Sequence, residues 1–398
     1  MNTILCLTSE VKGAAFIRQA KRLGCRVLLL TREKFRDAEW PRESLDDVFF
    51  MPSLENVPHV LNAVSYLARG QAIDQIVPLD DFEVETAGFL REHLRLPGMG
   101  VSLARHFRDK LAMRTVAAAA GVRVPAFTGV FNHERLRDFM ARVPAPWLLK
   151  PRAEASAMGI KKLHGPDELW PLLETLGDKQ SHYVLEQFLP GDVFHVDGLV
   201  WERELRFAAA SGYGRPPLDV YQGGGVFYTR VLEWEAPATQ ELLDFNAQTV
   251  RALGAAYGAT HAEYIRAPAD GQLYFVECAA RVGGANIAEA VEFATGVNLW
   301  AEWARLEVAA LRGEAYAPPE ARHGYAAVLN CLARQEWPDL APYADPEVVW
   351  RLHKPYHAGL ILATPDAARL QALVEAYSRR FAQDFLAVAP PLETGYEG

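Results

Sequence analysis

The chain has 398 residues, which is too long for one simple hydrophobic core, so we expect two or three domains. Half of the residues are hydrophobic and 23% are charged, as in ordinary globular proteins, and the net charge of −9 argues against a general nucleic-acid-binding protein. The four cysteines lack the paired spacing of a zinc site or a disulfide framework, and neither a secretion signal nor a bilayer-spanning apolar run is evident. These properties predict a soluble cytoplasmic protein with no nucleic-acid or membrane partner.

Strands and helices alternate over the first hundred residues, which predicts a small parallel sheet with helices on both faces. Strands are expected at 3–8, 26–31 and 75–79, and helices at 14–23, 57–69 and 83–94. The first turn lacks the G-x-G-x-x-G pattern, so no dinucleotide site is predicted there. Asp80, Asp81 and Glu83 follow the strand at 75–79, where ligands often bind in open α/β sheets. A helix cap explains these residues as well, and it is the interpretation we favour.

A small α+β unit follows a predicted helix at 107–120. Its strands are expected at 128–131, 147–150, 160–163 and 183–187, and its helices at 133–142 and 166–176. The rest of the chain is richer in strands, which are expected at 193–200, 205–213, 226–231, 261–266, 272–279 and 359–363. The remaining helices are expected at 237–254, 287–293, 298–313 and 365–385. We therefore predict an N-terminal βαβ domain over 1–105, a small subdomain over 106–190 and a large subdomain over 191–398.

The segment 263–284 gives the strongest chemical indication in the chain. Two β-like runs flank residues 268–271, and a three-residue loop with Gly271 in the left-handed region would make Pro268 face Gln272. Five residues further out on each side, Glu263 then faces Glu277. Two carboxylates directly across a strand pair repel each other, and a divalent cation resolves that conflict. Mg²⁺ is the natural candidate because it prefers carboxylate and phosphate oxygens.

A different turn would change this result. A two-residue Asp270-Gly271 turn would send the two glutamates to opposite faces and leave an acidic hairpin edge in solvent. In the predicted register one apolar face carries Tyr264, Tyr274, Val276 and Cys278, whereas Ile265 and Phe275 join the glutamates. This alternation does not decide between the two turns. Arg281 follows shortly afterwards, with a donor fork suited to carboxylate or phosphate.

Over nearly its whole length the chain resembles the ATP-grasp superfamily, because the superfamily's landmarks occur in the right order. They are a lysine in a helix, a lysine at the end of a strand, a small phosphate loop, a hinge for adenine, and paired metal carboxylates before an arginine. Here they read Asp109-Lys110, Leu149-Lys150-Pro151, Ala155-Ser156-Ala157-Met158-Gly159, Leu185-Glu186-Gln187-Phe188 with Gly191-Asp192, and then Glu263, Glu277 and Arg281. The resemblance implies an ATP-grasp fold of the α/β and α+β class. Its parts would be a doubly wound parallel-sheet domain, a small α+β lid domain and a larger mixed-sheet C-terminal domain.

The resemblance also implies a role for each landmark. Lys110 and Lys150 would hold phosphate oxygens, and the backbone of Ser156 to Gly159 would contact the phosphates. Adenine would lie after Glu186, against the backbone of Gln187 and Phe188. Taken alone, Lys110 fits a solvated helix lysine, whereas Lys150 is carried to a strand end by an apolar run.

Asp192 takes the position that holds ribose hydroxyls in the superfamily. As a residue just after Pro190-Gly191, it fits an ordinary turn nearly as well.

Two features depart from the superfamily's pattern. The phosphate loop is not rich in glycine, and Ala279 stands where an asparagine usually completes the metal site. In the predicted register Ala279 faces His261, and we hypothesise that His261, or a water that it orients, partly replaces that asparagine. The favoured alternative is a hydrogen-bonded strand histidine, since Mg²⁺ prefers oxygen donors.

The activity that the resemblance implies is ATP-dependent carboxylate–amine ligation by a homodimer, with Mg²⁺ or alternatively Mn²⁺. Transfer of the γ-phosphoryl group would give an acyl phosphate, which an amine attacks while Arg281 and Lys150 stabilise the developing charge. The run Glu-x-x-x-Arg-x-Gly-Gly favours the amino-acid ligases. One alternative is an ATP-grasp enzyme of nucleotide or one-carbon metabolism, which forms carboxyphosphate or formyl phosphate. Another is an ATP-binding regulatory protein whose catalysis has lapsed, as Ala279 suggests. Residues 223–225 are predicted to be either the hinge of a covering loop or an exposed turn.

Overall fold

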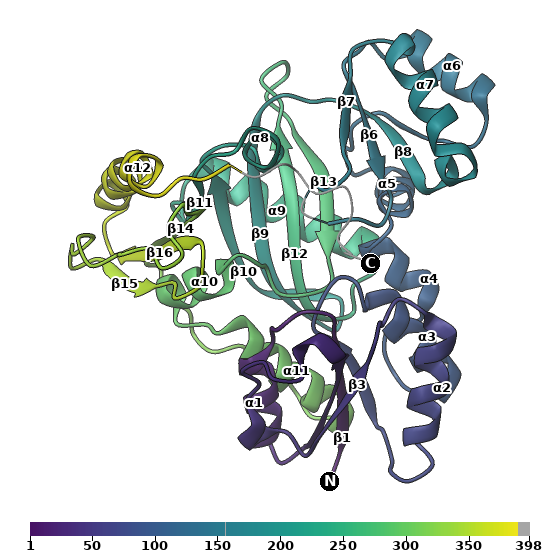
Figure 1. Cartoon of the computed structure of the whole chain (residues 1–398), viewed down its shortest axis with the longest axis vertical. Helices are drawn as coiled ribbons and strands as arrows, with labels where there is room; N and C mark the ends of the chain where they lie inside the picture. The colour runs from purple at the N-terminus through teal and green to yellow at the C-terminus, as the bar shows by residue number, and fades with distance from the viewer. Residues whose placement is uncertain (156, 389–398) are drawn as a thin grey trace.

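The protein is represented by a computed structural model that describes residues 1–155 and 157–388. Within these residues the strands form three sheets, which lie in different parts of the molecule (Figure 1). No helix in this part of the chain is long and apolar enough to cross a membrane. The predicted domain boundaries near residues 105 and 190 stay a prediction.

The N-terminal sheet is parallel, with the strand order β3-β2-β1-β4. Its strands are β1 (Thr3–Thr8), β2 (Arg26–Arg32), β3 (Asp47–Met51) and β4 (Gln75–Pro78). The helices are α1 (Ala14–Arg22), α2 (Val57–Leu67), α3 (Val84–Leu94) and α4 (Val101–Ala104). Helix α1 covers one face and helices α2 and α3 cover the other, which confirms the predicted arrangement. Strand β3 was not predicted, because it is a short edge strand with half-exposed side chains.

The cap predicted at the start of α3 is wrong. Glu83 precedes the helix, but its side chain caps no backbone N–H group there. Its carboxylate instead accepts hydrogen bonds from the backbone and the hydroxyl of Ser9, and Asp80 forms an ion pair with Lys12 at 3.0 Å. Asp81 turns toward a cavity described below. This edge of the sheet is therefore a polar network beside that cavity.

A small antiparallel sheet, with the order β5-β8-β6-β7, projects to one side of the molecule (Figure 1). Its strands are β5 (Phe127–Gly129), β6 (Trp147–Pro151), β7 (Lys161–Leu163) and β8 (Tyr183–Gln187). Helices α6 (His133–Arg142) and α7 (Pro166–Leu176) pack on it, and their shared core draws all of its residues from this unit. Helix α5 (Lys110–Ala119) precedes the sheet and starts three residues later than predicted, because the Asp109 carboxylate accepts hydrogen bonds from the N–H groups of Leu111 and Ala112.

The large sheet is antiparallel and has the order β13-β12-β9-β10-β11-β14-β16-β15. Its strands are β9 (Asp192–Trp201), β10 (Glu204–Tyr213), β11 (Phe227–Val231), β12 (Tyr257–Arg266), β13 (Leu273–Ala279), β14 (Tyr325–Leu332), β15 (Val348–Arg351) and β16 (His357–Thr364). Its helices are α8 (Pro217–Gly223), α9 (Pro237–Leu253), α10 (Ile287–Thr295), α11 (Leu299–Arg312) and α12 (Ala367–Asp384). Short 3-10 turns lie at Glu33–Phe35, Arg42–Ser44, Arg105–Phe107 and Gly177–His182. Strands β14 and β15 and helix α8 were not predicted.

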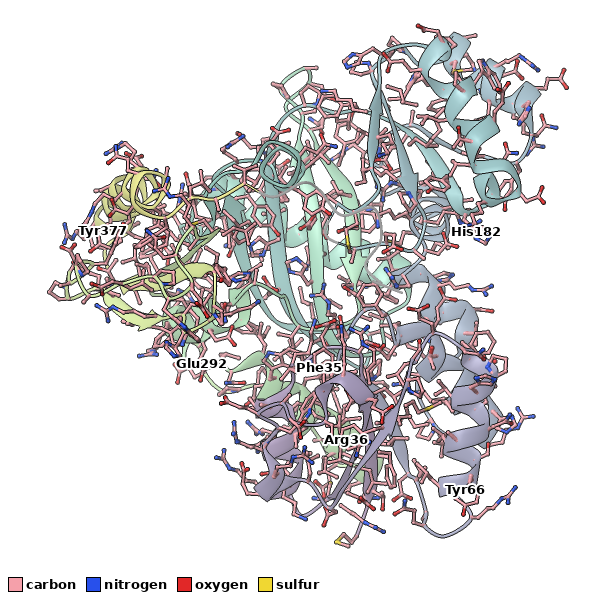
Figure 2. All side chains as sticks on the ribbon, viewed as in Figure 1. Phe35, Arg36, Tyr66, His182, Glu292 and Tyr377 are labelled. Atoms are coloured by element: carbon pink, nitrogen blue, oxygen red, sulfur yellow. The ribbon has the colours of Figure 1, made fainter. Side chains whose placement is uncertain are left out.

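Side chains fill the space between the layers, whereas peripheral residues such as Tyr66 on α2 extend into solvent (Figure 2). The N-terminal sheet and the large sheet share one hydrophobic core. Phe16 of α1 and Trp303 of α11 meet in it edge to face, with ring centroids 5.4 Å apart. A buried hydrogen bond of 2.8 Å from Gln75 on β4 to Glu307 on α11 adds a second link. These two sheets therefore pack as one body.

Candidate active site

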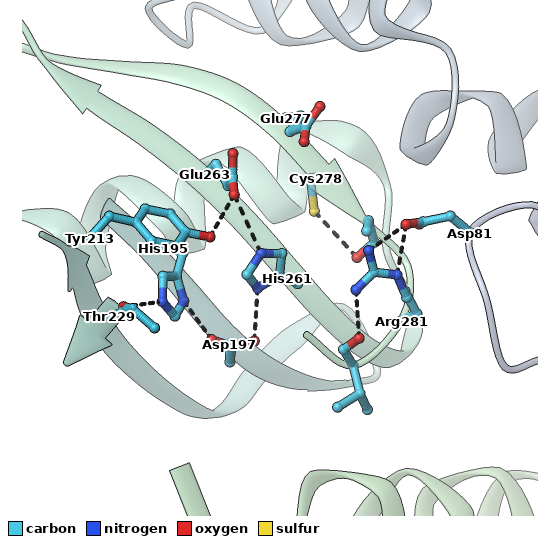
Figure 3. Close-up of polar contacts among 12 residues, drawn as sticks. Asp81, His195, Asp197, Tyr213, Thr229, His261, Glu263, Glu277, Cys278 and Arg281 are labelled. Atoms are coloured by element: carbon cyan, nitrogen blue, oxygen red, sulfur yellow. Dashed lines mark hydrogen bonds and ion pairs between the residues drawn. The ribbon is translucent and has the colours of Figure 1, made fainter. Parts of the chain in front are cut away.

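The two glutamates that the sequence predicted to be opposite each other are paired across β12 and β13 (Figure 3). The route to this pairing differs from the prediction. Ala267, not Pro268, faces Gln272, and its N–H donates to the Gln272 carbonyl at 3.0 Å, so the loop contains four residues. Gly271 has a φ of 72°, in the left-handed region as expected.

A β-bulge restores the register further along the hairpin. Tyr264 pairs with Phe275 and Glu263 pairs with Glu277, so Val276 is an extra residue on β13. The predicted distribution of side chains is wrong for this reason: Phe275 shares the buried face of Tyr264, under α9, and Val276 joins the glutamates. The bulge thus directs an apolar side chain and a carboxylate, adjacent in sequence, to the same side.

That side of the hairpin lines a cavity with a volume of about 490 Å³, within the usual range for small-molecule sites. The cavity lies between the small sheet and the large sheet, and the loop after β4 also contributes to it. The charged residues of its lining are Asp81, Arg108, Lys110, Lys150, Glu154, Glu186, Asp219, His261, Glu263, Glu277 and Arg281. Most of the predicted site residues are therefore brought together.

Lys110 connects the glutamate pair to helix α5. Its ammonium group lies 3.1 Å from Oε2 of Glu277 and donates to the backbone carbonyl of Glu154 at 2.6 Å. The residue is 7% exposed, so the alternative of a solvated helix lysine is wrong. Asp109 fixes its position, because it caps the helix and also forms an ion pair with Arg152.

Lys150 and Glu186 belong to a buried three-residue network. The Lys150 ammonium group and the Arg114 guanidinium bind different oxygens of the Glu186 carboxylate, at 2.5 and 2.7 Å. Burial alone would raise the pKa of Glu186, but the two cations hold it below its ordinary value. Burial lowers the pKa of Lys150, and Glu186 opposes that shift. Arg114 has no counterpart among the predicted site residues.

Gln187 and Phe188 follow the network and line the cavity. Their backbone N–H groups donate to the carbonyls of Ala126 and Pro146 at 2.8 and 3.1 Å. A ligand would therefore meet their carbonyl groups and side chains. The Phe188 ring also has the Lys162 ammonium group 3.6 Å from its centroid.

Glu263 is held by a chain of buried polar residues (Figure 3). The Tyr213 hydroxyl donates to its Oε1 at 2.7 Å, and Nε2 of His261 lies 3.6 Å from the same oxygen. On its other side, His261 binds Asp197 at 2.9 Å, and Asp197 also binds His195 at 2.7 Å. Burial alone would lower the pKa of His261, but Asp197 and Glu263 raise it to about 10.

These contacts bear on the hypothesis that His261 partly replaces the asparagine missing at position 279. His261 pairs with Ala279 across the hairpin, as predicted, and its ring is a hydrogen-bonded strand histidine between Asp197 and Glu263. His195, Asp197 and His261 could in principle hold a metal, but each already has a protein partner, and Nε2 of His195 lies 2.7 Å from the Thr229 hydroxyl. Among the described residues no hydrogen bond reaches Oε2 of Glu263. That free oxygen, opposite Glu277, is the better place for a cation.

Arg281 lies at the opposite end of the site and binds Asp81 through two guanidinium nitrogens, Nε at 2.7 Å and Nη2. Its third nitrogen, Nη1, donates to the Val282 carbonyl at 2.7 Å. Burial opposes ionisation of both residues, but each charge shifts the other's pKa so that Asp81 stays a carboxylate and Arg281 a guanidinium. The loop after β4 is thus joined to the end of the β12–β13 hairpin.

Three predicted nucleotide-binding residues are not among the described residues that line the cavity: Ser156, Gly159 and Asp192. Ser156 lies outside the described residues. Gly159 has a φ of 66° and lies in the loop whose residues Ala157 and Met158 line the cavity. Asp192 is exposed at the start of β9 and is not part of the lining, so its predicted ribose contact stays a prediction.

Helix α8 closes one side of the cavity and ends at Gly223, the first of the residues predicted to form a hinge or an exposed turn. Residues 216–221 line the cavity, and Gln222 donates to the Ile160 carbonyl of the small unit at 3.2 Å. Gly224 and Gly225, with φ of 70° and 146°, follow the helix. These contacts support a covering role for helix α8, whereas the choice between a hinge and an exposed turn at residues 223–225 stays a prediction.

The chain is similar in sequence and in fold to several known enzymes. An L-arginine-specific L-amino acid ligase from Bacillus subtilis is 24% identical over 320 residues, which cover 77% of this chain and 76% of the relative. An L-amino acid ligase structure from Bacillus licheniformis has a TM-score of 0.77 at 17% identity and covers 98% of both chains. The N5-carboxyaminoimidazole synthetase from Staphylococcus aureus, complexed with ADP, has a TM-score of 0.71 at 15% identity and covers 94% of this chain and 96% of that chain. No family model matches the chain.

The chain therefore has the ATP-grasp fold, and the resemblance drawn from its motifs is confirmed. At the sequence level its named relatives include the L-amino acid ligase above and several D-alanine–D-alanine ligases.

Proposed function

We propose that this protein is an ATP-dependent carboxylate–amine ligase that joins small molecules, at least one of them an amino acid. One observation carries the proposal. A single cavity contains two facing carboxylates, the lysine paired with one of them, and an arginine at the end of the same hairpin. Such a set neutralises the charge of a phosphoryl group and of a carboxylate at the same time.

The nucleotide would occupy the part of the cavity between the small sheet and the hairpin. Its walls there are apolar and suit a purine ring: Met113, Leu148, Met158, Val193, Ile265 and Val276. The carbonyl groups of Gln187 and Phe188 would accept hydrogen bonds from an exocyclic amino group. Lys110 and Lys150 would then face the phosphates as point cations.

The metal fits the residues that are present. Glu263 offers a free Oε2 and Glu277 lies directly across the strand pair, which gives Mg²⁺ the hard oxygen ligands that it prefers. When bound, Mg²⁺ would neutralise phosphate charge during transfer. Tyr213 and His261 would keep the Glu263 carboxylate oriented, which is how His261 would compensate for the alanine at position 279.

The reaction then follows in two steps. An oxygen of the acid's carboxylate attacks the γ-phosphorus, the bond from phosphorus to the β–γ bridging oxygen breaks, and ADP leaves with an acyl phosphate formed. The amine nitrogen then attacks the carbonyl carbon, loses a proton, and expels inorganic phosphate to give the amide. Arg281, held by Asp81, would stabilise the negative charge on the acyl phosphate and on the tetrahedral intermediate. Helix α8 would exclude the water that hydrolyses the intermediate.

The test is release of ADP and phosphate from Mg·ATP in the presence of pooled amino acids and other acids, with mass spectrometry of the products. Glu277→Ala should abolish turnover, whereas the matched control Glu320→Ala, at an exposed site outside the cavity, should not. A product mass equal to condensation of an acid and an amine would support the proposal. Turnover that needs bicarbonate or formate would favour the carboxyphosphate or formyl phosphate enzymes, and ATP binding without turnover would favour the lapsed regulatory protein.

The homodimer and the cytoplasmic location stay predictions. Light scattering coupled to size exclusion would give the oligomeric state.

A further inference from the structure

Most arginines in and around the cavity have a carboxylate partner. The pairs are Arg281 with Asp81, Arg114 with Glu186, Arg152 with Asp109 and Arg105 with Glu85. Arg108 differs from them. Within residues 1–155 and 157–388 its guanidinium makes no hydrogen bond and no carboxylate oxygen lies within 4.0 Å, although the residue lines the cavity and is only 8% exposed.

The surroundings of Arg108 make this isolation costly. Its guanidinium lies 4.9 Å from the centroid of the Phe82 ring, which covers one face of the ion but accepts none of its five N–H donors. Asp81 is close enough for Arg108 to lower its pKa, yet the carboxylate is hydrogen-bonded to Arg281. Asp81 thus faces two guanidinium groups and is hydrogen-bonded only to that of Arg281. A largely buried cation without a hydrogen-bonded anion is unfavourable, so the Arg108 guanidinium is available to bind an anionic group in the cavity.

The chemistry of Arg108 indicates which kind of anion is missing. A guanidinium presents parallel N–H donors that match the two oxygens of a carboxylate. The phosphates of a nucleotide already have Lys110 and Lys150, and the carboxylate to be activated already has Arg281. Arg108 lies on the side of the cavity that faces Asp81 and Phe82, two residues of the loop after β4. Lys150, by contrast, comes from β6 of the small sheet. A second carboxylate, one that does not react, fits this place.

We infer that Arg108 binds the free carboxylate of the nucleophile, so that the amine substrate is an amino acid and the product a peptide with a free C-terminal carboxylate. This inference rests on the proposed function. It excludes simple amines, amino acid amides and ammonia as the preferred nucleophiles. It also makes Arg108 a specificity-determining residue for the second step of the reaction.

The experiment compares nucleophiles at a fixed acid substrate and saturating Mg·ATP. The nucleophiles are the L-amino acid that condenses fastest in the pooled assay, the carboxamide of that amino acid, and hydroxylamine, which traps an acyl phosphate as a hydroxamate and has no carboxylate. The readout is the ratio of kcat/KM for the amino acid to kcat/KM for its carboxamide. We expect this ratio to fall by about 100-fold or more in Arg108→Met, since a charge-assisted bidentate contact is lost.

Two further variants keep the result interpretable. Arg105→Met removes an arginine that is half exposed, three residues earlier, and should leave the ratio unchanged. Arg108→Lys keeps the positive charge but loses the planar fork, so the ratio should fall by about tenfold, and this variant serves if Arg108→Met does not fold.

The outcomes separate the inference from the proposed function. If the wild-type protein forms no hydroxamate with any acid, the proposed function fails, and the inference fails with it. If hydroxamate forms but Arg108→Met keeps the wild-type ratio, the inference alone is overturned. An equal loss with amino acid, carboxamide and hydroxylamine would overturn it as well, because Arg108 would then serve the nucleotide or the activated acid.

Discussion

Substitution of Glu186 by glutamine should destabilise the small sheet. The carboxylate is 2% exposed and separates two cations, Arg114 and Lys150, which are 0% and 5% exposed. Glutamine has nearly the same shape but no charge, so the variant leaves two buried like charges around a neutral amide. Removal of one partner from a buried ion pair costs about 3–5 kcal/mol, and 3 kcal/mol corresponds to about a 150-fold change in a local opening equilibrium.

Hydrogen–deuterium exchange can measure this change in the strands concerned. We expect protection of peptides that cover β6 and β8 to fall by about 150-fold or more in Glu186→Gln, while protection of β1 in the N-terminal sheet stays at the wild-type level. The matched control is Glu174→Gln, at an exposed site on α7. Protection of β6 and β8 within about threefold of wild type would refute the reasoning.

The pH dependence provides a second check. In the wild-type protein the pKa of Glu186 is lowered, so its contribution to stability is present above the ordinary carboxyl pKa of 4.5 and is lost as the pH falls through the folded-state value. In the variant, burial still lowers the pKa of Lys150 and no carboxylate opposes the shift. The variant should therefore recover part of its lost protection as the pH rises and Lys150 loses its proton.

Three other predictions concern the site and its surroundings. Tyr213→Phe removes the hydroxyl that donates to Glu263, so the Mg²⁺ concentration for half-maximal ADP release should rise about tenfold. His261→Ala should raise this concentration as well. An unchanged Mg²⁺ dependence would contradict the roles of Tyr213 and His261 in positioning Glu263. Burial, together with Asp80, raises the pKa of Glu83 to about 7. The free energy of unfolding of the wild-type protein should therefore fall by about 3 kcal/mol between pH 4.5 and 7, relative to that of Glu83→Gln. Urea denaturation at each pH measures both values. All four cysteines are buried, and burial raises the pKa of the Cys278 thiol, so iodoacetamide should label the protein in urea but not in its native state. Labelling of Cys278 in the native state would show that the β12–β13 hairpin opens.

The hairpin shows how far sequence reasoning can reach. The opposition of Glu263 and Glu277 was predicted correctly, but through a three-residue loop that does not form. The four-residue loop and the bulge at Val276 each shift the register by one residue, and the two shifts cancel. Residue types fix the possible turns, whereas the choice between them depends on tertiary packing, here the burial of Tyr264 and Phe275 under α9.

Other features could not be predicted from the sequence, because they depend on contacts between residues far apart in the chain or on a pattern that does not distinguish a strand from a helix. His195 and Asp197 lie two residues apart on β9 and so share a face, but their link to His261 depends on the pairing of β9 with β12, which joins residues 64 positions apart. Strand β14 was missed because a continuous apolar run cannot be assigned to a strand or a helix by periodicity. Asp81 was noticed beside the predicted cap, yet its true partner, Arg281, lies 200 residues further along the chain.

The shared core of the N-terminal and large sheets has a mechanical consequence. Because Phe16, Trp303 and their neighbours pack these two sheets together, the wall that carries Asp81, Arg108 and Arg281 cannot deform without disturbing a close-packed interior. The small sheet has a core of its own, and polar side chains join it to the rest of the molecule: Glu186 and Arg152 bind helix α5, and Gln222 binds Ile160. Under the proposed function, nucleotide exchange would move the small sheet as one unit, while the wall with Asp81, Arg108 and Arg281 would keep its shape.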